Sequence, residues 1–265
     1  MGLFSRILGT KKKKAASNGI VYAQQDKRMQ QASKEAQKNF KYFWRELYWE
    51  YRRIVPAHDF AMIKIPFEQE VADQDTLVEH MWINNISFNG ETITGELVNE
   101  PQQLTNIKQG DRVERSISQI DDWMLSIQGE VYGGFTIQAM RVGMSGKERR
   151  KHDQAWGLDF GDPNEILVVS RQKEQPENLI EHPMSKNMAG KVRDFLMENP
   201  EEIKTIDGDG LSMLHREAIA GNRTNIEILL DLGADTRMLS LAGKSALAYA
   251  QAMGWQHLTE ILTSA

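Results

Sequence analysis

Hydrophobic residues recur at helical spacing over residues 22–55, and Pro56 ends the pattern. One aromatic stripe follows the i, i+3, i+4, i+7 rule and consists of Phe40, Phe43, Trp44, Leu47, Tyr48 and Tyr51. We expect a long helix that packs this stripe against its own domain, although the stripe would also suit a binding partner. Tyr42 and Trp49 lie off the stripe and are therefore the better candidates for exposed aromatic contacts.

The pattern changes to strand-like alternation after residue 60. The predicted strands cover 61–67, 80–88, 92–98 and 112–117, and a short helix covers 135–141. Asn89-Gly90, between two of these strands, is a favoured hairpin turn. We expect 147–151 to form a hydrophilic connector, and 156–160 with 165–169 to form one more hairpin. Together these elements predict a small curved antiparallel sheet.

The last third of the chain repeats itself at a spacing of 33 residues. Gly210 recurs at Gly243, and Phe195, Ile228 and Ile261 share one register. A period of this length is typical of helical units that stack on their neighbours. Such units leave an outer face free to bind another macromolecule. The repeat therefore indicates a binding protein.

The segment Gly210-Leu-Ser-Met-Leu-His215, followed by Gly221-Asn222 and Gly233-Ala-Asp235, resembles the ankyrin consensus. There are two departures, because Ser212-Met213 replaces the usual Thr-Pro and Glu217 occupies a position where a small residue normally packs. The resemblance implies about two and a half repeats, fewer than the three that a stable stack usually needs.

The expected fold class is therefore α+β. A long N-terminal helix would pack on the small curved antiparallel sheet, and an all-α ankyrin repeat stack would follow. The expected domains are a basic flexible tail over 1–21, the α+β domain over 22–170, a linker over 171–183 and the repeats over 184–265.

The composition limits the cellular compartments and the kinds of chemistry that the protein can be expected to use. The chain has no cysteine, which excludes disulfides, thiolate zinc sites and cysteine nucleophiles. It also shows neither a long apolar run nor a signal-peptide pattern. We therefore expect a soluble, cytoplasmic protein that has no metal and no cofactor.

Charge is distributed unevenly along the chain. Residues 1–55 carry 13 Lys/Arg against 4 Asp/Glu, whereas the remainder carries 19 against 33. An acidic body argues against nucleic acid as the ligand, because phosphate binding needs a concentrated cationic surface. The acidic body would suit a basic protein partner.

In the basic tail, the apolar residues among residues 1–14 have the helical spacing of a segment that makes weak contact with a membrane surface. A disordered start of the chain is the favoured interpretation.

Motifs for catalysis and metal binding are missing or incomplete. Gly243-Lys244-Ser245 lacks the first glycine of a phosphate-binding loop, and the calcium-loop opening at Asp207 has Ala218 where glutamate is required. Glu79, His80 and Asp121 could supply acid–base groups, but paired acids such as Asp121-Asp122 are more often turn formers or helix caps. We therefore expect no enzymatic activity.

Three motifs stand in a characteristic order between residues 35 and 145, namely Glu79-His-Met-Trp82, Asn99-Glu-Pro101 and Asp121-Asp-Trp-Met124. Through these motifs the chain resembles a bacterial family, the YegJ-like domain of unknown function. The family brings no activity with it, but its sheet-plus-helix pattern is similar to that of small immunity proteins of bacterial toxin systems. Trp82 and Trp123 are expected core anchors. The alternative is one concave site formed by Trp82, Asn99, Glu100 and Trp123.

We conclude that the sequence favours a non-enzymatic module that binds another protein, with an immunity or antitoxin-like role as its most concrete form. The expected partner contacts are Asp207, Asp209, Arg216, Asp235, Arg237 and Trp255. Two alternatives stay open. One is a membrane-surface adaptor that uses the basic tail, and the other is an uncharacterised enzyme that uses Glu79, His80 and Asp121.

Overall fold

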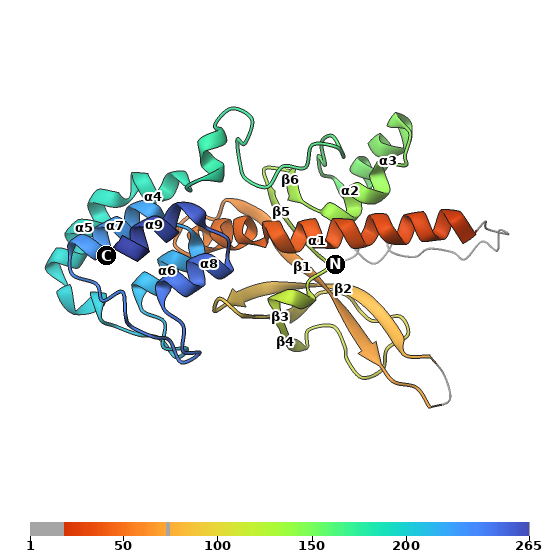
Figure 1. Ribbon diagram of the computed structural model, residues 1–265. Coiled ribbons are helices and arrows are strands. Elements are labelled where there is room, and N and C mark those ends of the chain that lie inside the picture. The colour runs from red at the N-terminus through yellow and green to blue at the C-terminus, as the bar shows by residue number, and fades with distance from the viewer. Residues whose placement is uncertain (1–18, 73–74, 265) are drawn as a thin grey trace. The chain divides into compact units, whose positions relative to one another are not determined.

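The computed structural model describes residues 19–72 and 75–264 of the chain (Figure 1). The strands are β1 (His58–Gln69), β2 (Leu77–Phe88), β3 (Thr92–Leu97), β4 (Arg112–Ser116), β5 (Asp122–Ile127) and β6 (Glu130–Gly133). The helices are α1 (Gly19–Glu50), α2 (Phe135–Arg141), α3 (Gly146–Trp156), α4 (Pro183–Asn187), α5 (Ala189–Glu198), α6 (Met213–Ala220), α7 (Arg223–Asp231), α8 (Ala246–Ala252) and α9 (Gln256–Ser264). The predicted tail lies outside the described residues, apart from the first turn of α1.

The strands form one six-stranded sheet in the order β4-β3-β2-β1-β5-β6. The central pairs are antiparallel, and Lys64 of β1 lies opposite both Trp82 of β2 and Asp122 of β5. Ile63, its neighbour on β1, pairs with Trp123. Because successive side chains on a strand point to opposite faces, Trp82 and Trp123 lie on opposite faces of the sheet.

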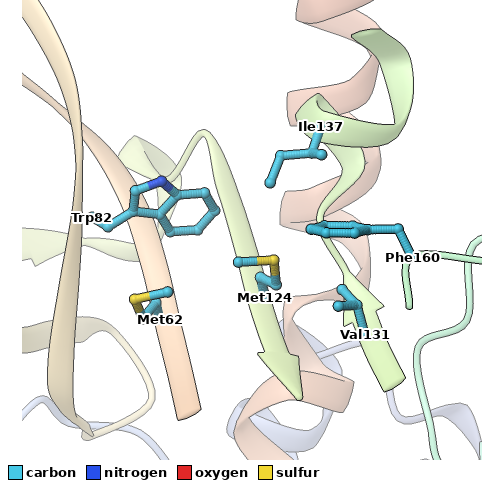
Figure 2. Packing of buried hydrophobic residues seen from close by; sticks show 6 residues of the cluster. All are labelled: Met62, Trp82, Met124, Val131, Ile137 and Phe160. Atoms are coloured by element: carbon cyan, nitrogen blue, oxygen red, sulfur yellow. The ribbon is translucent and has the colours of Figure 1, made fainter. Parts of the chain in front are cut away.

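One face of the sheet packs against the first half of α1. The indole N–H of Trp123 donates to the carbonyl oxygen of Ala36 on that helix over 2.9 Å, and both residues are fully buried. The other face holds a cluster consisting of Met62, Trp82, Met124, Val131, Ile137 and Phe160. Figure 2 shows Ile137 of α2 and Phe160 within this cluster, so α2 and the segment that follows α3 both contribute to the core on this face.

Helix α3 was not expected from the sequence, because 147–151 is polar on every side. Its start is fixed by Ser145, whose hydroxyl accepts from the Glu148 N–H while the Glu148 carboxylate accepts from the Ser145 N–H. Gly157 ends it in a left-handed conformation. Ser145, Glu148 and Gly157 are therefore the residues from which this helix could have been predicted.

The hairpin expected from 156–160 and 165–169 is wrong. After α3 the chain instead runs beside β6, where the Val131 N–H donates to Asp159 O and the Gly133 N–H donates to Leu167 O. This segment satisfies backbone groups at the outer edge of β6 without forming a regular strand of its own.

The chain divides into two compact units, and the division falls inside α1. The first contains the described residues up to Phe40 together with 55–87 and 92–168. The second, which we call the C-terminal unit, contains 41–54, 88–91 and 169–265. The second half of α1 and the turn between β2 and β3 are therefore part of the same unit as α4 to α9.

The predicted fold class is wrong in its second half. The structure shows a mixed α+β arrangement in which helices follow a six-stranded antiparallel sheet irregularly, and not an all-α ankyrin stack. The physical reason is visible at Glu217, the residue that departs from the repeat consensus. Its buried carboxylate accepts hydrogen bonds from Tyr48 and Arg52, which lie at the end of α1. The C-terminal helices therefore pack against the second half of α1.

Candidate partner-binding surface

Two loops of the C-terminal unit lie against each other, one before α6 and one before α8 (Figure 1). The Leu241 N–H donates to Asp209 O over 3.1 Å, which joins them directly. Gly210 permits this approach, because it has a φ of 71° and a Cβ there would lie 2.8 Å from the Leu241 nitrogen. We call residues 206–211 and 235–244 together the loop surface.

His215 holds the second of these loops on α6. Its Nε2 lies 3.1 Å from both Met238 O and Lys244 O, and its Nδ1 accepts from the Ser212 N–H. Burial lowers the pKa of His215 although both carbonyl oxygens favour the protonated ring. The ring is therefore neutral near pH 7, with its proton on Nε2. Through this N–H it holds the backbone of the second loop against α6.

The loop surface presents large apolar side chains to solvent. Leu241 is 78% exposed, Leu239 60% and Ile206 54%. Single exposed leucines are ordinary, but three such residues on two joined loops form a local apolar feature. Apolar residues on loops that a rigid scaffold holds in place are typical of protein contact sites.

Two of the predicted aspartates are neutralised within the loops. Asp207 lies 3.3 Å from Arg216, and Asp235 lies 3.2 Å from Arg237. Both carboxylates also shape turns, since Asp207 accepts from the Leu211 N–H and Asp235 from the Arg237 N–H. Hydrogen bonds from Arg237 lower the pKa of Asp235. The four predicted residues therefore form two separate ion pairs, and the charges within each pair largely cancel.

Asp209 differs from the other two aspartates. Its carboxylate accepts only a side-chain amide hydrogen bond from Asn89, over 3.3 Å, and it makes no ion pair among the residues that the structure describes. It is therefore the acidic residue of the loop surface whose charge remains available to a partner.

Trp255 and Trp49, both predicted as contact residues, are each 2% exposed. The Trp255 indole donates to Ile219 O over 3.0 Å, and the Trp49 indole donates to the side chain of Asn222 over 3.0 Å. Both are core residues of the C-terminal unit, and each indole N–H has the acceptor that a buried donor needs.

Of the four residues proposed for a site in the sheet domain, the structure brings two together. The Trp82 N–H donates to the side chain of Asn99 over 2.9 Å, and Glu100 is exposed beside Asn99. Trp123 faces the opposite side of the sheet. A concave site shared by all four is therefore not formed by this arrangement.

His80 and Asp121 lie together, as the enzymatic alternative would require. His80 Nδ1 is 2.5 Å from Asp121 Oδ2, and the imidazole is half exposed. Glu79, however, accepts from the N–H groups of Gln102 and Leu104 and so holds a loop in place. Among residues 19–72 and 75–264, no group of three or more His, Asp or Glu side chains could hold a metal ion.

Asp122 is the strongly perturbed carboxylate of the sheet domain. It is fully buried, and it accepts from the Phe135 N–H and from both the N–H and the hydroxyl of Thr136. Burial raises its pKa to about 6 against the opposing effect of these hydrogen bonds. The group caps α2 from 13 residues away, which agrees with the helix-cap interpretation and leaves it no access to a substrate.

Comparisons with known proteins place the chain in a bacterial family. A family model described as "Uncharacterized protein conserved in bacteria (DUF2314)" matches residues 26–160. A Neisseria meningitidis serogroup B protein named "Putative ankyrin repeat protein" is 48% identical over 244 residues, which cover 92% of this chain and 96% of that protein. The uncharacterized protein YegJ of Escherichia coli K12 is 30% identical over 64 residues, which cover 24% of this chain and 42% of YegJ.

Within the described part of the chain, none of the helices combines the length and the apolar character needed to cross a bilayer.

Proposed function

The chain belongs to the DUF2314 family of uncharacterized proteins conserved in bacteria, and we propose that it is a non-enzymatic module that binds another protein through the loop surface. The name of its Neisseria relative, which spans nearly the whole chain, points in the same direction. The family itself supplies no activity, so the proposal depends on the geometry of the loops.

The observation that carries the proposal is the exposure of Leu239 and Leu241 on loops that are otherwise firmly held. Leu241 is 78% exposed although its own N–H is bonded to Asp209 O. The backbone is thus ordered while the side chain stays in water. Such pre-organised apolar side chains lose little conformational entropy on binding and are suited to fill pockets on a partner.

Charge supports a basic partner. Asp209 carries a carboxylate without an ion-pair partner in the described structure, and residues 56–265 carry 33 Asp/Glu against 19 Lys/Arg. Opposite charge at the rim of an interface mainly accelerates and orients association. The narrower form of the proposal is an immunity or antitoxin-like protein that binds a basic effector in the cytoplasm.

The test is a crosslinked pull-down of tagged full-length protein from its own cells, analysed by mass spectrometry. The informative variant is Leu239→Ser with Leu241→Ser, and the matched control is Ile180→Ser, which changes a residue that is 57% exposed outside the loops. We expect a stoichiometric partner that the double variant loses and the control retains. Deleting the C-terminal helices would be a poor control, because residues 41–54 belong to the same unit.

Asp209→Lys tests the charge component of the proposal. It should slow association and reduce its dependence on salt, since it reverses a charge without disturbing an apolar contact. A partner that binds the wild type, the double leucine variant and Asp209→Lys equally well would rule out the loop surface. Protection of cells from a co-expressed partner would support the immunity form.

A further inference from the structure

A second feature of the C-terminal unit lies outside the loop surface. An apolar cavity of about 280 Å³ opens where the end of α1 meets α4, α5 and α6. Its apolar lining comprises Trp49, Met184, Met188, Val192, Phe195 and Met213, and its charged lining comprises Arg52, Lys191 and Glu217. Cavities that hold a cofactor or a drug-sized ligand usually exceed about 300 Å³, so this one suits one or two side chains of a peptide.

The inner wall of the cavity is rigid. Trp49 stacks on the imidazole of His182 at 5.7 Å and 18° between planes, and its indole N–H is bonded to Asn222. The outer wall is adaptable, since Met184, Met188 and Met213 are unbranched and can repack around different shapes. A fixed aromatic wall facing flexible methionines would accept apolar side chains of more than one shape.

The side chain of Phe195 shows that the cavity is open to solvent on one side. In the 33-residue register it corresponds to Ile228, which is 4% exposed, whereas Phe195 is 47% exposed. Ile228 is covered by neighbouring helices, but nothing in the described part of the C-terminal unit covers Phe195 to the same degree. The half-exposed ring is thus the place where an apolar residue of a partner would bury the most surface.

The charges around the cavity favour a carboxylate. Glu217 accepts hydrogen bonds from Tyr48, Arg52, Asn222 and Asn225, so its oxygen atoms are occupied and Arg52 balances its charge. Lys191 is exposed and forms no ion pair among the described residues. The lining therefore has one positive charge in excess, carried by an ammonium group that is free to meet an acid.

We propose that this cavity is a second docking site, for a short peptide segment of a partner protein that places an apolar side chain next to an aspartate or glutamate. The apolar residue enters between Trp49 and the methionines, and the carboxylate meets Lys191. The site is independent of the loop surface, because none of its lining residues belongs to 206–211 or 235–244.

The experiment uses a phage-displayed library of random peptides against immobilised full-length protein. The most enriched peptide is then synthesised with a fluorescent label, and its binding is measured by fluorescence anisotropy. The variants are Lys191→Glu, Lys191→Met and Phe195→Ser, with Lys204→Glu as a control that reverses an exposed lysine away from the cavity. Thermal unfolding of each variant confirms that the C-terminal unit is intact.

We expect enriched peptides that carry a large apolar residue beside an acidic one. Lys191→Glu should raise Kd about tenfold or more, because attraction becomes repulsion, and Lys191→Met should reduce the salt dependence. Lys204→Glu and the double leucine variant of the loop surface should leave Kd unchanged, which separates this site from the proposed function.

The proposal is overturned if the library yields no enriched peptide, or if enriched peptides lack acidic residues. It is also overturned if their binding ignores Lys191 and Phe195. A protein that sediments as a dimer and becomes a monomer in Phe195→Ser would assign the cavity to a second copy of this chain instead.

Discussion

The hydroxyl of Tyr48 donates a 2.7 Å hydrogen bond to Oε1 of Glu217, and the two residues are 169 positions apart in the chain. Arg52 donates to the same oxygen over 3.0 Å, while the other carboxylate oxygen accepts from the side chains of Asn222 and Asn225. Glu217 is 1% exposed. One buried carboxylate on α6 therefore accepts from donors at the end of α1 and at the start of α7, and so joins the three helices.

Glu217→Ala should destabilise the C-terminal unit by about 3 kcal/mol, because it leaves several buried donors without an acceptor. Glu217→Gln keeps the shape but loses the charge and one acceptor, and it should cost roughly half as much. The measurement is urea unfolding followed by tryptophan fluorescence. Glu198→Ala, an exposed acid on α5, serves as the control and should change the free energy of unfolding by less than about 0.5 kcal/mol.

Gly221 and Gly243 form a matched pair with φ values of 77° and 70°. Gly243→Ala meets no atom within 4 Å, so only the left-handed backbone penalises it, by about 1 kcal/mol. At Gly221 a Cβ would lie 2.4 Å from the Trp255 ring, and the overlap should add about 1–3 kcal/mol. Thermal unfolding of the two variants measures the difference; equal melting temperatures would contradict the predicted contact with Trp255.

Asp122 should make the sheet domain less stable as pH rises through its titration range. Burial raises its pKa from 3.8 to about 6, so the folded state binds the proton more tightly than the unfolded state. The favourable contribution is complete below pH 3.8 and is lost as pH passes about 6. Asp122→Asn cannot titrate. The stability advantage of the wild type over this variant should therefore shrink between those pH values, and an advantage that grows with pH would refute the assignment.

His215 should show the opposite dependence. Burial lowers its pKa from 6.5, so the unfolded state binds the proton first, and stability is lost as pH falls below 6.5. Because the ring holds Met238 O and Lys244 O, protonation should loosen the second loop before the rest of the unit. An NMR titration of the ring, with hydrogen exchange at residues 238–244, measures both effects. A ring that titrates above pH 6.5 would contradict this prediction.

Patterns of neighbouring residues correctly predicted three features of the fold. The helix expected over 135–141 is confirmed, and the buried aromatic stripe on α1 is confirmed at Phe43 and Tyr48. The hairpin turn at Asn89-Gly90 is also present, with a φ of 97° at Gly90. Residue types and spacing indicate these features locally, although the burial of Tyr48 also depends on Glu217, 169 positions away, and Gly90 lies against the ring of Tyr249.

The errors arose where distant residues decide the outcome. The ankyrin pattern of 210–235 correctly indicated helices, but no pattern shows that Glu217 is neutralised by Arg52 or that α1 shares a unit with those helices. The prediction of Trp49 and Trp255 as surface residues is wrong, because their burial depends on Asn222 and Ile219, which lie far away in sequence. The exposure of Leu239 and Leu241 carried no sequence signal at all.

The position of the unit boundary inside α1 has a consequence for synthesis of the protein. Tyr48 leaves the ribosome 169 residues before Glu217, and until the C-terminal helices follow, Tyr48 and Trp49 lack their buried partners Glu217 and Asn222. The nascent chain must therefore carry an aromatic surface through most of translation, a stage at which exposed apolar residues attract chaperones and neighbouring chains. A stop codon before position 217 would remove both Glu217 and Asn222 and leave that surface uncovered.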